Sequence, residues 1–415
     1  MKSKQTVEMF YDVKTGKYPV RLGDRYVPLS SGDVELHLRN VGISKENHDG
    51  VMNGLERAFF VTQTERSVDY SAPLAGHDLG AFRTSDGRRI LVTSCPRLVE
   101  AKRGKWDWTR ERFEELLGDQ FEHFIAWLKC AVESLERRDF KPGQILILAG
   151  KPNCGKSFLQ WCITQCFGGR CADPLLWLRG GTTFNGSLSE AEHWAIEDPG
   201  SATRGNVRRD FGDAIKRAVI NREVFVHPKG GKGITVQLWR RLTMSVNEEV
   251  ENISALPPLD DSMKDKVMMF KCGVATLSED ALLNQKRFRD ELPALLYFCK
   301  QFNIPKALRC PRMGIVSFHH HELVEALTVL SPEQHLIELI DEVIFANGSI
   351  CPFVGSAERL KQELMRSEFR LTVEKLLYYS SACGVYLERL SKRNPERVSS
   401  SRLEGKTRWT VKSPH

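Results

Sequence analysis

The spacing of apolar residues changes along the chain, and each change predicts a different kind of structure. Over residues 1–100, short strand-like runs (YPVRL, RYVPL and RRILVTS) surround one helical stretch at residues 33–40. From residue 106 to about 138, apolar side chains recur at helical spacing, as they do on a helix that packs by one face. We therefore expect a small accessory α+β domain over residues 1–100 and a helical linker over residues 101–140.

The next part of the chain alternates between the two patterns. Strand-like and helical runs follow one another from residue 144 to about 272, which is typical of an α/β fold built in layers. A mostly helical connector is expected over residues 276–350. Residues 351–415 begin with helical patterns at 357–365 and 372–380 and end in a basic β-hairpin. This last segment predicts a winged-helix-like domain.

Composition adds only a few limits to this picture. The 415 residues include 60 basic and 53 acidic side chains, and the formal net charge of +7 suggests an anionic partner without requiring one. No apolar run approaches the roughly 20 residues that span a bilayer, and the first residues lack the apolar core of a signal peptide. We expect a cytoplasmic protein with no membrane partner.

Cysteine and histidine usage gives no sign of a protein-built metal site. The 11 cysteines contain no CxxC pair, so scattered reduced thiols are expected in place of disulfides or a zinc site. The run His319-His320-His321 is not expected to bind a metal, because adjacent side chains point in different directions. The chemistry must therefore lie in other motifs.

The most specific motif follows the apolar strand QILILA at residues 144–149. It matches the pattern GxxxxGKS and consists of Gly150, Lys151, Pro152, Asn153, Cys154, Gly155, Lys156 and Ser157. The residues after it, FLQWCITQCF, read as a helix. A strand, a glycine-rich loop and a helix in this order cradle phosphates, with Lys156 at the β- and γ-phosphates and Ser157 on Mg²⁺. A chance glycine turn is the alternative, but the flanking strand and helix favour an ATP site with bound Mg²⁺.

Two further polar groups end apolar strands in the same part of the chain. Trp194-Ala195-Ile196 runs into Glu197 and Asp198, and a strand over residues 241–247 ends in Asn247. One carboxylate would hold Mg²⁺ while the other polarises the attacking water, and the sequence does not say which does which. The Asn247 amide would sense the γ-phosphate. Solvated acids at a strand end and a turn-forming asparagine are the alternatives.

A basic turn lies between two strand-like runs, residues 223–226 and 234–238. It contains His227, Lys229, Gly230, Gly231 and Lys232. Small residues let a backbone approach a phosphate chain, and two lysines supply charge without base readout, so this hairpin is a candidate for binding single-stranded DNA. A hairpin that is merely solvated is the alternative.

The order and compact spacing of these motifs resemble superfamily 3 helicases of small DNA viruses, phages and plasmids. Residues 209–229 resemble the stretch between the acidic motif and the DNA-binding hairpin of papillomavirus replicative helicases, and VQL at 236–238 and SVN at 245–247 fit the same pattern. Primase–helicase proteins of phages and integrated mobile elements are similar as well. The resemblance covers roughly residues 140–275 and implies an AAA+ P-loop motor domain at residues 141–275.

One position departs from that family. Superfamily 3 helicases usually place an arginine finger after the sensor strand and ahead of an apolar strand, and the matching segment here reads MKDKVMMF. Lys266 stands at the finger position, and lysine supplies charge but no bidentate fork. Either Lys266 does the work, which we prefer, or Arg209, Arg240 or Arg241 reaches across a subunit boundary.

The C-terminal hairpin region concentrates positive charge. Residues 386–412 carry eight basic and three acidic side chains, which accounts for five of the seven net charges. A winged-helix-like domain with this charge would bind duplex DNA. The expected contacts are Lys392, Arg393, Arg397, Arg402, Lys406 and Arg408. A solvated basic domain that only packs on the motor is the alternative.

The resemblance implies an ATP-driven DNA helicase that works as a ring, usually a hexamer, and moves 3′ to 5′. It would track single-stranded DNA and unwind forked duplex to replicate a phage or mobile genetic element in a bacterial cytoplasm, with host replication proteins as further partners. An AAA+ loader or switch that assembles on DNA and recruits host proteins without processive unwinding is the alternative, but it has no need for Lys229 and Lys232 in a pore. A structural DNA-binding protein with an inactive ATPase is a further alternative, but it conflicts with the intact Lys156, Ser157, Glu197 and Asp198.

Overall fold

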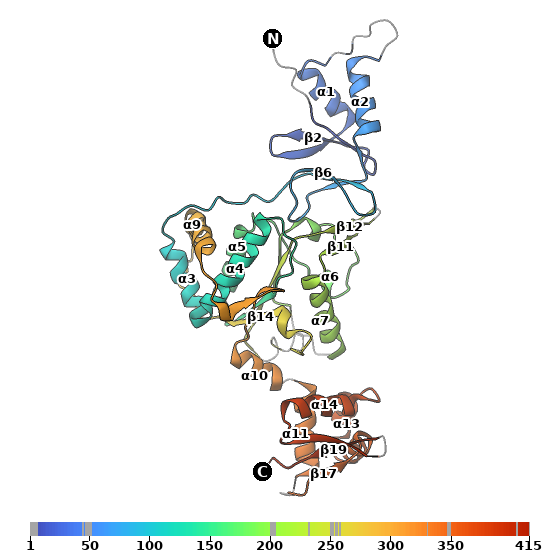
Figure 1. Ribbon diagram of the computed structural model, residues 1–415, viewed down its shortest axis with the longest axis vertical. Helices are drawn as coiled ribbons and strands as arrows, with labels where there is room; N and C mark the ends of the chain where they lie inside the picture. Colours follow the sequence, from blue (N-terminus) through green and yellow to red (C-terminus); the bar gives the residue numbers. More distant parts are fainter. Residues whose placement is uncertain are drawn as a thin grey trace. The chain divides into compact units, whose positions relative to one another are not determined.

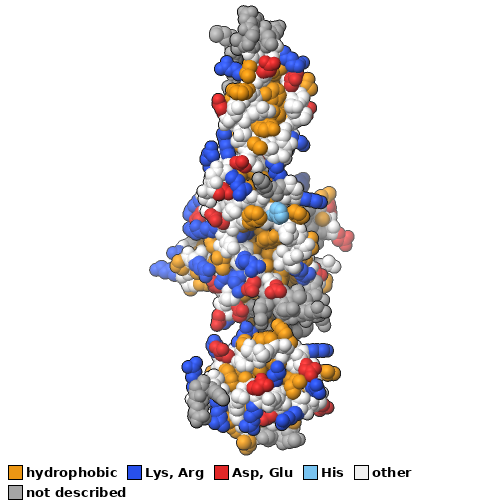
Figure 2. All heavy atoms as spheres, turned by 90° about the vertical axis from the view of Figure 1, so that its right-hand side faces the viewer, with side chains coloured by type: hydrophobic (Ala, Val, Ile, Leu, Met, Phe, Trp, Pro, Cys, Tyr) orange, Lys and Arg blue, Asp and Glu red, His pale blue; other side chains and the backbone are white. Residues whose placement is uncertain are grey.

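The structure is a computed structural model that describes residues 7–43, 45, 52–199, 205–230, 233–249, 253, 256, 259–329, 331–346, 350–403 and 406–414 (Figure 1). The chain divides into two compact units, Met1–His320 and His321–His415, and each is described by itself. Among the described helices, none is long and apolar enough to cross a membrane. On the face drawn in Figure 2, lysine and arginine side chains are interspersed with acidic ones, in keeping with the mild net charge.

A five-stranded parallel sheet organises the first unit, in the order β14-β8-β13-β10-β9. Its strands are β8 (Ile145–Gly150), β9 (Cys171–Ala172), β10 (His193–Glu197), β13 (Arg241–Asn247) and β14 (Val267–Lys271). The α/β class predicted from the alternating pattern is confirmed. Since all five strands are parallel, their carboxyl ends meet at one edge, where Glu197 pairs with Ser245 and Asn247 pairs with Gly150.

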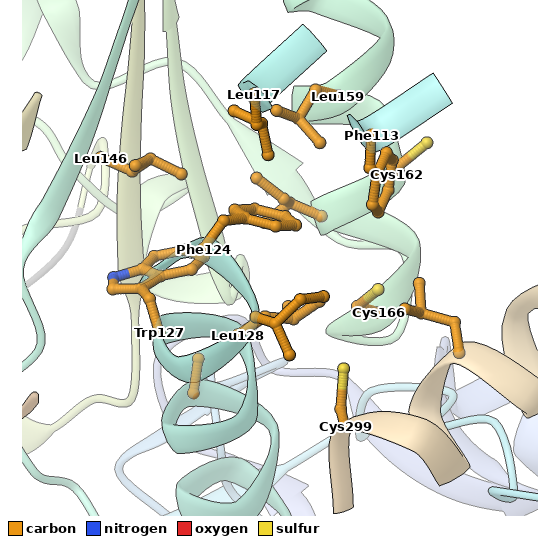
Figure 3. Packing of buried hydrophobic residues seen from close by; sticks show 14 of the residues in the cluster. Phe113, Leu117, Phe124, Trp127, Leu128, Leu146, Leu159, Cys162, Cys166 and Cys299 are labelled. Carbon is orange, nitrogen blue, oxygen red and sulfur yellow. The ribbon is translucent and has the colours of Figure 1, made fainter. Parts of the chain in front are cut away.

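Four helices pack with β8 and β14 into the main core of this unit (Figure 3). They are α3 (Asp107–Leu117), α4 (Phe121–Glu136), α5 (Lys156–Cys166) and α9 (Ala281–Gln301). Figure 3 shows the thiols of Cys162, Cys166 and Cys299 among the aromatic and aliphatic side chains of this core. Burial raises the pKa of the Cys299 thiol to about 12, so these cysteines act as small apolar groups.

The described residues between 7 and 93 form short strands and two helices, called the N-terminal layer below. The predicted runs YPVRL and RYVPL are the antiparallel pair β2 (Tyr18–Leu22) and β3 (Arg25–Leu29), and the predicted helix is α1 (Ser31–Asn40). The other elements are α2 (Gly54–Glu65), β1 (Tyr11–Asp12), β4 (Ser67–Val68), β5 (Tyr70–Ala72), β6 (Gly80–Arg83) and β7 (Arg89–Val92). Helix α2 was not predicted, although Asn53 and Glu56 form a capping box at its start.

The other elements of this unit lie between the sheet strands or, for one β-pair, after β14. They are α6 (Leu175–Leu178), α7 (Gly205–Ile220), the antiparallel hairpin β11 (Glu223–Val226) and β12 (Ile234–Gln237), and the pair β15 (Arg309–Cys310) and β16 (Gly314–Ile315). Single 3₁₀ turns occupy Gly118–Gln120, Leu188–Glu190, Lys264–Lys266 and Lys306–Leu308. The hairpin predicted around the basic turn is therefore present.

The second unit packs helices against a small antiparallel sheet with the order β17-β19-β18. Its elements are α10 (His321–Val329), α11 (Pro332–Ile344), β17 (Phe353–Gly355), α12 (Ala357–Met365), α13 (Arg370–Leu376), α14 (Ala382–Arg393), β18 (Val398–Leu403) and β19 (Lys406–Val411). The helix at 357–365 and the terminal hairpin agree with the sequence prediction. Helix α14 was missed, because the charged residues in its second half dominate the pattern. The winged-helix assignment stays a prediction.

Candidate functional site

A cavity of about 850 Å³ opens at the carboxyl edge of the parallel sheet. Four segments that are far apart in sequence line it: the P-loop with the start of α5, the end of β10, the end of β13, and a short segment after β14. The lining residues are Pro152, Asn153, Cys154, Gly155, Lys156, Ser157, Phe158, Glu197, Asp198, Ser245, Val246, Asn247, Ala275, Leu277, Ser278 and Glu279. The structure therefore brings together the predicted phosphate loop, the paired carboxylates and the predicted sensor.

Glycines are required at two points of the phosphate loop. Gly155 adopts φ +111° immediately before α5, and a Cβ there would lie 3.1 Å from the Cβ of Ala275. A Cβ at Gly150 would lie 2.9 Å from both the Cβ and the carbonyl oxygen of Cys272. Helix α5 has no side-chain cap, so its first N–H groups are available to phosphate oxygens.

The Lys156 side chain is buried and held by carbonyl groups of the preceding loop. Its Nζ donates to the carbonyl oxygens of Gly150 at 2.8 Å and Lys151 at 2.6 Å. It also lies 3.4 Å from Oδ1 of Asn247 at the end of β13. One ammonium group therefore links the phosphate loop to the sensor strand, and the predicted residues Gly150 and Lys151 act through their carbonyls.

The two carboxylates are exposed at the end of β10 and face the same cavity. Asp198 has φ +42°, a left-handed conformation that costs a non-glycine residue roughly 1–2 kcal/mol. Its backbone N–H donates to the carbonyl oxygen of Ser245 at 3.2 Å, which ties this turn to β13. The oxygens of Ser157, Glu197 and Asp198 are the donor type that Mg²⁺ prefers, with the remaining positions left to water and phosphate.

Two of the predicted finger residues are interior side chains. Arg240 donates to the carbonyl oxygens of Ala218 and Asn221 at 2.8 and 2.7 Å, and Arg241 donates to that of Lys141 at 3.1 Å. Burial lowers the pKa of each guanidinium to about 10. These backbone partners give Arg240 and Arg241 a structural role, and we do not retain them as fingers.

The other two residues predicted as fingers are Lys266 and Arg209, and the structure describes the side chain of Lys266 alone. The Lys266 side chain is 8% exposed, and its Nζ lies 2.5 Å from Oδ1 of Asp265. The side chain of Arg209 lies outside the described residues. Lys266 thus remains at the predicted place, at the amino end of β14, but with its charge paired and buried.

The hairpin β11–β12 presents part of the predicted DNA-binding set. His227 is half-buried, Lys229 is exposed and Gly230 has φ +75°, whereas Gly231 and Lys232 lie outside the described residues. Asn185 fixes this end of β11: its Oδ1 accepts from the N–H of His227 at 2.6 Å, and its Nδ2 donates to the carbonyl oxygen of Phe225 at 2.9 Å. The start of the basic turn therefore has a defined position.

Two exposed aromatic rings beside His227 were missed from the sequence. Phe184 is 45% exposed with its ring centroid 5.0 Å from that of His227, and Phe225 is 59% exposed with its centroid 6.1 Å away. The alternation in EVFV would have placed Phe225 on the outward face of β11. Phe184 comes from another loop, and no local pattern predicts its approach. The rings widen the candidate nucleic-acid surface.

The N-terminal layer supports the opposite face of the hairpin. Apolar residues of β5 and β7 share a core with Val226, Ile234, Val236 and Leu238. Nη1 of Arg88 donates to the carbonyl oxygen of Gly233 at 2.5 Å. Part of the region predicted as an accessory domain therefore packs against the hairpin and supports it.

An ion pair just before β10 helps to hold the N-terminal layer against the parallel sheet. Arg170 pairs with Glu192, which immediately precedes β10 and is fully buried. Oε1 of Glu192 also accepts from the N–H of Gly76 at 2.9 Å, and a Cβ at Gly76 would lie 2.3 Å from the Cβ of Trp239. The chain at Gly76 therefore packs directly against Trp239, in the link between the hairpin and β13, where only glycine fits.

The His319-His320-His321 run has a structural explanation at its first position. A ring nitrogen of His319 lies 3.0 Å from the carbonyl oxygen of Val267, and burial lowers the pKa of the His319 imidazole. Within the described part of the chain, no group of three or more His, Cys, Asp or Glu side chains is arranged to hold a metal ion.

The residues of the second unit that were predicted to contact duplex DNA do not lie on one surface. Arg397 is half-buried and paired with Asp341, with Nη2 and Oδ1 2.6 Å apart, so its guanidinium is already engaged. Arg402 and Arg408 are exposed, but the register places them on opposite faces of the β18–β19 hairpin. Exposed Lys392 and Arg393 lie in the last turn of α14, and the Lys406 side chain is outside the described residues.

Comparison with solved structures shows a likeness of fold over nearly the whole chain. The apo structure of the NrS-1 C-terminal region, residues 305–718 of that protein, has a TM-score of 0.58 at 12% identity, covering 98% of this chain and 96% of that chain. A second apo structure of that region, its A form, gives 0.55 at 12% identity over 98% and 97%. At these identities the likeness concerns the fold alone. No protein-family model and no curated protein matches the chain.

The structural neighbours also include two helicases. JCV helicase, solved with a bound acetamide compound, covers 57% of this chain and 66% of its own at 12% identity, with a TM-score of 0.28. The active helicase Cch of SCCmec type IV covers 94% of this chain and 73% of its own at 11% identity, with a TM-score of 0.29. TM-scores this low do not establish a shared fold with these helicases. The function is therefore inferred from the site itself.

Proposed function

We propose that this protein is an ATP-dependent DNA helicase of the superfamily 3 type, whose AAA+ motor works as a ring, most simply a hexamer. The observation that carries the proposal is the single cavity that unites the P-loop, the carboxylates Glu197 and Asp198, and the amide of Asn247. Movement 3′ to 5′ and replication of a phage or mobile element belong to the proposal through the sequence resemblance alone.

ATP hydrolysis at this site follows from the residues in the cavity. The ammonium of Lys156 would exchange its loop carbonyls for β- and γ-phosphate oxygens, which frees Oδ1 of Asn247 to orient the attacking water. Glu197 or Asp198 would accept the proton of that water. Mg²⁺ held near Ser157 would supply charge that offsets the phosphates.

A continuous stretch of chain connects the ATP site with the hairpin. Strand β13 carries Asn247 at one end, and only residues 238–240 separate its other end from β12. These three residues, Leu238, Trp239 and Arg240, are buried. Seven strand residues span about 23 Å, so a displacement at the γ-phosphate would be transmitted to the hairpin through a packed strand.

The DNA contacts are proposed from charge and exposure. Lys229 and Lys232 would contact the backbone of single-stranded DNA, and the exposed rings of Phe184 and Phe225 beside His227 would stack on bases. In the second unit, Arg408 and the α14 end with Lys392 and Arg393 are the better placed contacts for duplex DNA. Arg397 is already paired with Asp341.

Unwinding of a forked DNA substrate tests the proposal. Wild type is compared with Lys156→Ala, with Lys229→Ala/Lys232→Ala, and with Lys102→Ala/Lys105→Ala, which removes two exposed lysines elsewhere. We expect Lys156→Ala to lose ATPase activity by at least about 100-fold. The hairpin variant should keep basal ATPase activity and lose unwinding, and the matched control should keep both.

A different pattern would favour another function. If the wild type hydrolyses ATP and assembles on DNA but separates no strands at any polarity or salt concentration, the loader or switch becomes the better explanation. If the wild type shows no ATPase activity with any single-stranded or forked DNA, the motor proposal itself is wrong.

A further inference from the structure

The position that should supply a finger is occupied by a lysine whose charge is already used. Lys266 is 8% exposed and bound to Asp265, so it presents no free cation to a neighbouring subunit in this structure. Asp265 has a second cationic partner, however. Nη1 of Arg312 lies 2.9 Å from Oδ2 of Asp265, although the two residues are 47 positions apart.

Arg312 has the properties that Lys266 lacks. It lies in the turn between β15 and β16, and 55% of its side chain is exposed. Its guanidinium presents a planar fork that matches phosphate oxygens, and it stays charged throughout the physiological pH range. The fold thus delivers an exposed arginine to the amino end of β14 from a distant segment.

The position of Arg312 rules out a role in its own ATP site. Val267 pairs with Ile145 and Lys271 pairs with Ala149, so the amino ends of β14 and β8 lie at one edge and the phosphate loop lies at the other. The six residues of β8 span about 20 Å, which is longer than any side chain. Arg312 therefore cannot reach ATP bound by its own chain, and any role in hydrolysis would be at the site of another copy.

The ATP cavity needs such a cation. Among the described residues that line it, three are acidic, namely Glu197, Asp198 and Glu279, and Lys156 is the one basic side chain. A triphosphate adds several negative charges, which become concentrated at the γ-phosphate during transfer. A single lysine and one Mg²⁺ leave the side of the cavity away from the P-loop without positive charge.

We propose that Arg312 is the trans-acting arginine finger, and that Asp265 and Lys266 position it. Its guanidinium would contact γ-phosphate oxygens of ATP bound by a neighbouring copy. In that step the water oxygen bonds to the γ-phosphorus and the bond to the bridging oxygen breaks. The water proton passes to Glu197 or Asp198, and ADP and phosphate leave. This inference rests on the proposed function and names the residue that completes its site.

Steady-state ATPase assays with single-stranded DNA give the first test. Arg312→Ala should lower kcat by at least about 100-fold with little change in ATP affinity, because the finger acts on the transition state. Arg312→Lys should recover only a small part, since lysine has no fork. Arg309→Ala is the matched control: this exposed arginine of the same β-pair bonds the carbonyl of Ile304 and the side chain of Asn303.

Mixed assemblies separate action in trans from a folding defect. Arg312→Ala and Lys156→Ala chains carrying different tags are co-expressed, and assemblies that contain both are isolated by two affinity steps. Each variant alone should be inactive, whereas the mixture should regain ATPase activity. The recovered sites are those in which an intact Lys156 faces an intact Arg312 of the neighbour.

The outcomes distinguish this inference from the proposed function. If the wild type hydrolyses ATP and Arg312→Ala stays within twofold of it, Arg312 is not the finger. If isolated mixed assemblies are no more active than either variant alone, the action in trans is refuted. If the wild type itself hydrolyses no ATP, the proposed function fails, and the finger assignment falls with it.

Discussion

The Nζ atom of Lys156 lies 3.4 Å from Oδ1 of Asn247, so the phosphate loop and the sensor strand share a hydrogen bond. In the proposed function Asn247 has two states, one in which it holds the lysine, as here, and one in which it is free for the γ-phosphate. The same Nζ donates to the carbonyl oxygens of Gly150 and Lys151, and these bonds would give way to phosphate oxygens when ATP binds. In the proposed function, Lys156 therefore binds the phosphates and Asn247 senses the γ-phosphate.

We expect Asn247→Ala to bind ATP with an affinity close to that of the wild type but to hydrolyse it about 10²–10³-fold more slowly. The reason is that the substitution removes a group that orients water, while Lys156 stays available to bind the phosphates. Nucleotide titration and single-turnover hydrolysis measure the two effects. Asn221→Ala, at an exposed position, is the control. Loss of binding equal to the loss of rate would contradict a sensing role.

Phe225→Ala should weaken binding of single-stranded DNA by about 5–150-fold, because an aromatic ring stacked on a base contributes roughly 1–3 kcal/mol. Basal ATPase activity should not change, since Phe225 lies on the exposed face of β11. Fluorescence anisotropy with a labelled oligonucleotide gives the affinity. Phe60→Ala removes a comparably exposed ring, 52% accessible, from helix α2 and should have no effect. Equal affinities for Phe225→Ala and wild type would remove the stacking role.

Arg88→Ala should reduce the stimulation of ATPase activity by DNA while leaving the basal rate intact. Arg88 bonds the carbonyl of Gly233 and so links the N-terminal layer to the hairpin turn. Arg83→Ala is the matched control, because Arg83 in the same small sheet bonds the carbonyl of Gly87 instead. ATPase rates with and without single-stranded DNA decide the matter. Similar stimulation in both variants would show that the hairpin needs no such support.

Acid should destabilise the motor through His193. This imidazole is fully buried between the hydroxyls of Thr164 and Thr243, and burial lowers its pKa to about 3. The unfolded chain takes up the proton near pH 6.5 and the folded chain does not, so stability falls as pH drops below about 6.5. The contribution between pH 6.5 and 5 is about 2 kcal/mol.

Urea unfolding at pH 7.5 and pH 5.0 measures this effect. His193→Gln should start less stable than wild type at pH 7.5, because it loses a fitted partner of two threonines. It should then lose about 2 kcal/mol less than wild type between the two pH values. The comparison cancels the effect of other histidines such as the partly buried His77, whose pKa burial also lowers. Parallel pH dependences of wild type and variant would exclude His193 as the source.

Local patterns predicted the elements well where one physical cause dominated. The strand before the P-loop, the sensor strand and helix α12 appear where apolar spacing put them. The missed helix α14 buries residues such as Tyr386, Leu387 and Leu390 in its middle, but its last turn is basic and sits next to a hairpin of the same character. Charge composition there concealed the apolar face.

The sequence could not predict contacts between segments that no strand or motif rule connects. Spacing and strand ends predicted that Glu197, Asp198 and Asn247 meet the P-loop, because parallel strands place their carboxyl ends together. No comparable rule brings Phe184 to His227. Nor does one bring Arg312 to Asp265, since that approach depends on how a short β-pair folds back toward β14.

The close passage of the chain at Gly76 limits how this protein can be divided or recombined. A motor cut free after Val92 would lose the glycine that fits against Trp239 and the apolar cover over Ile234 and Val236, and would leave Glu192 without its backbone donor. Chimaeras with related motors should therefore be joined ahead of Tyr70. Residues 70–92 and the hairpin should be exchanged together, because they share one apolar core.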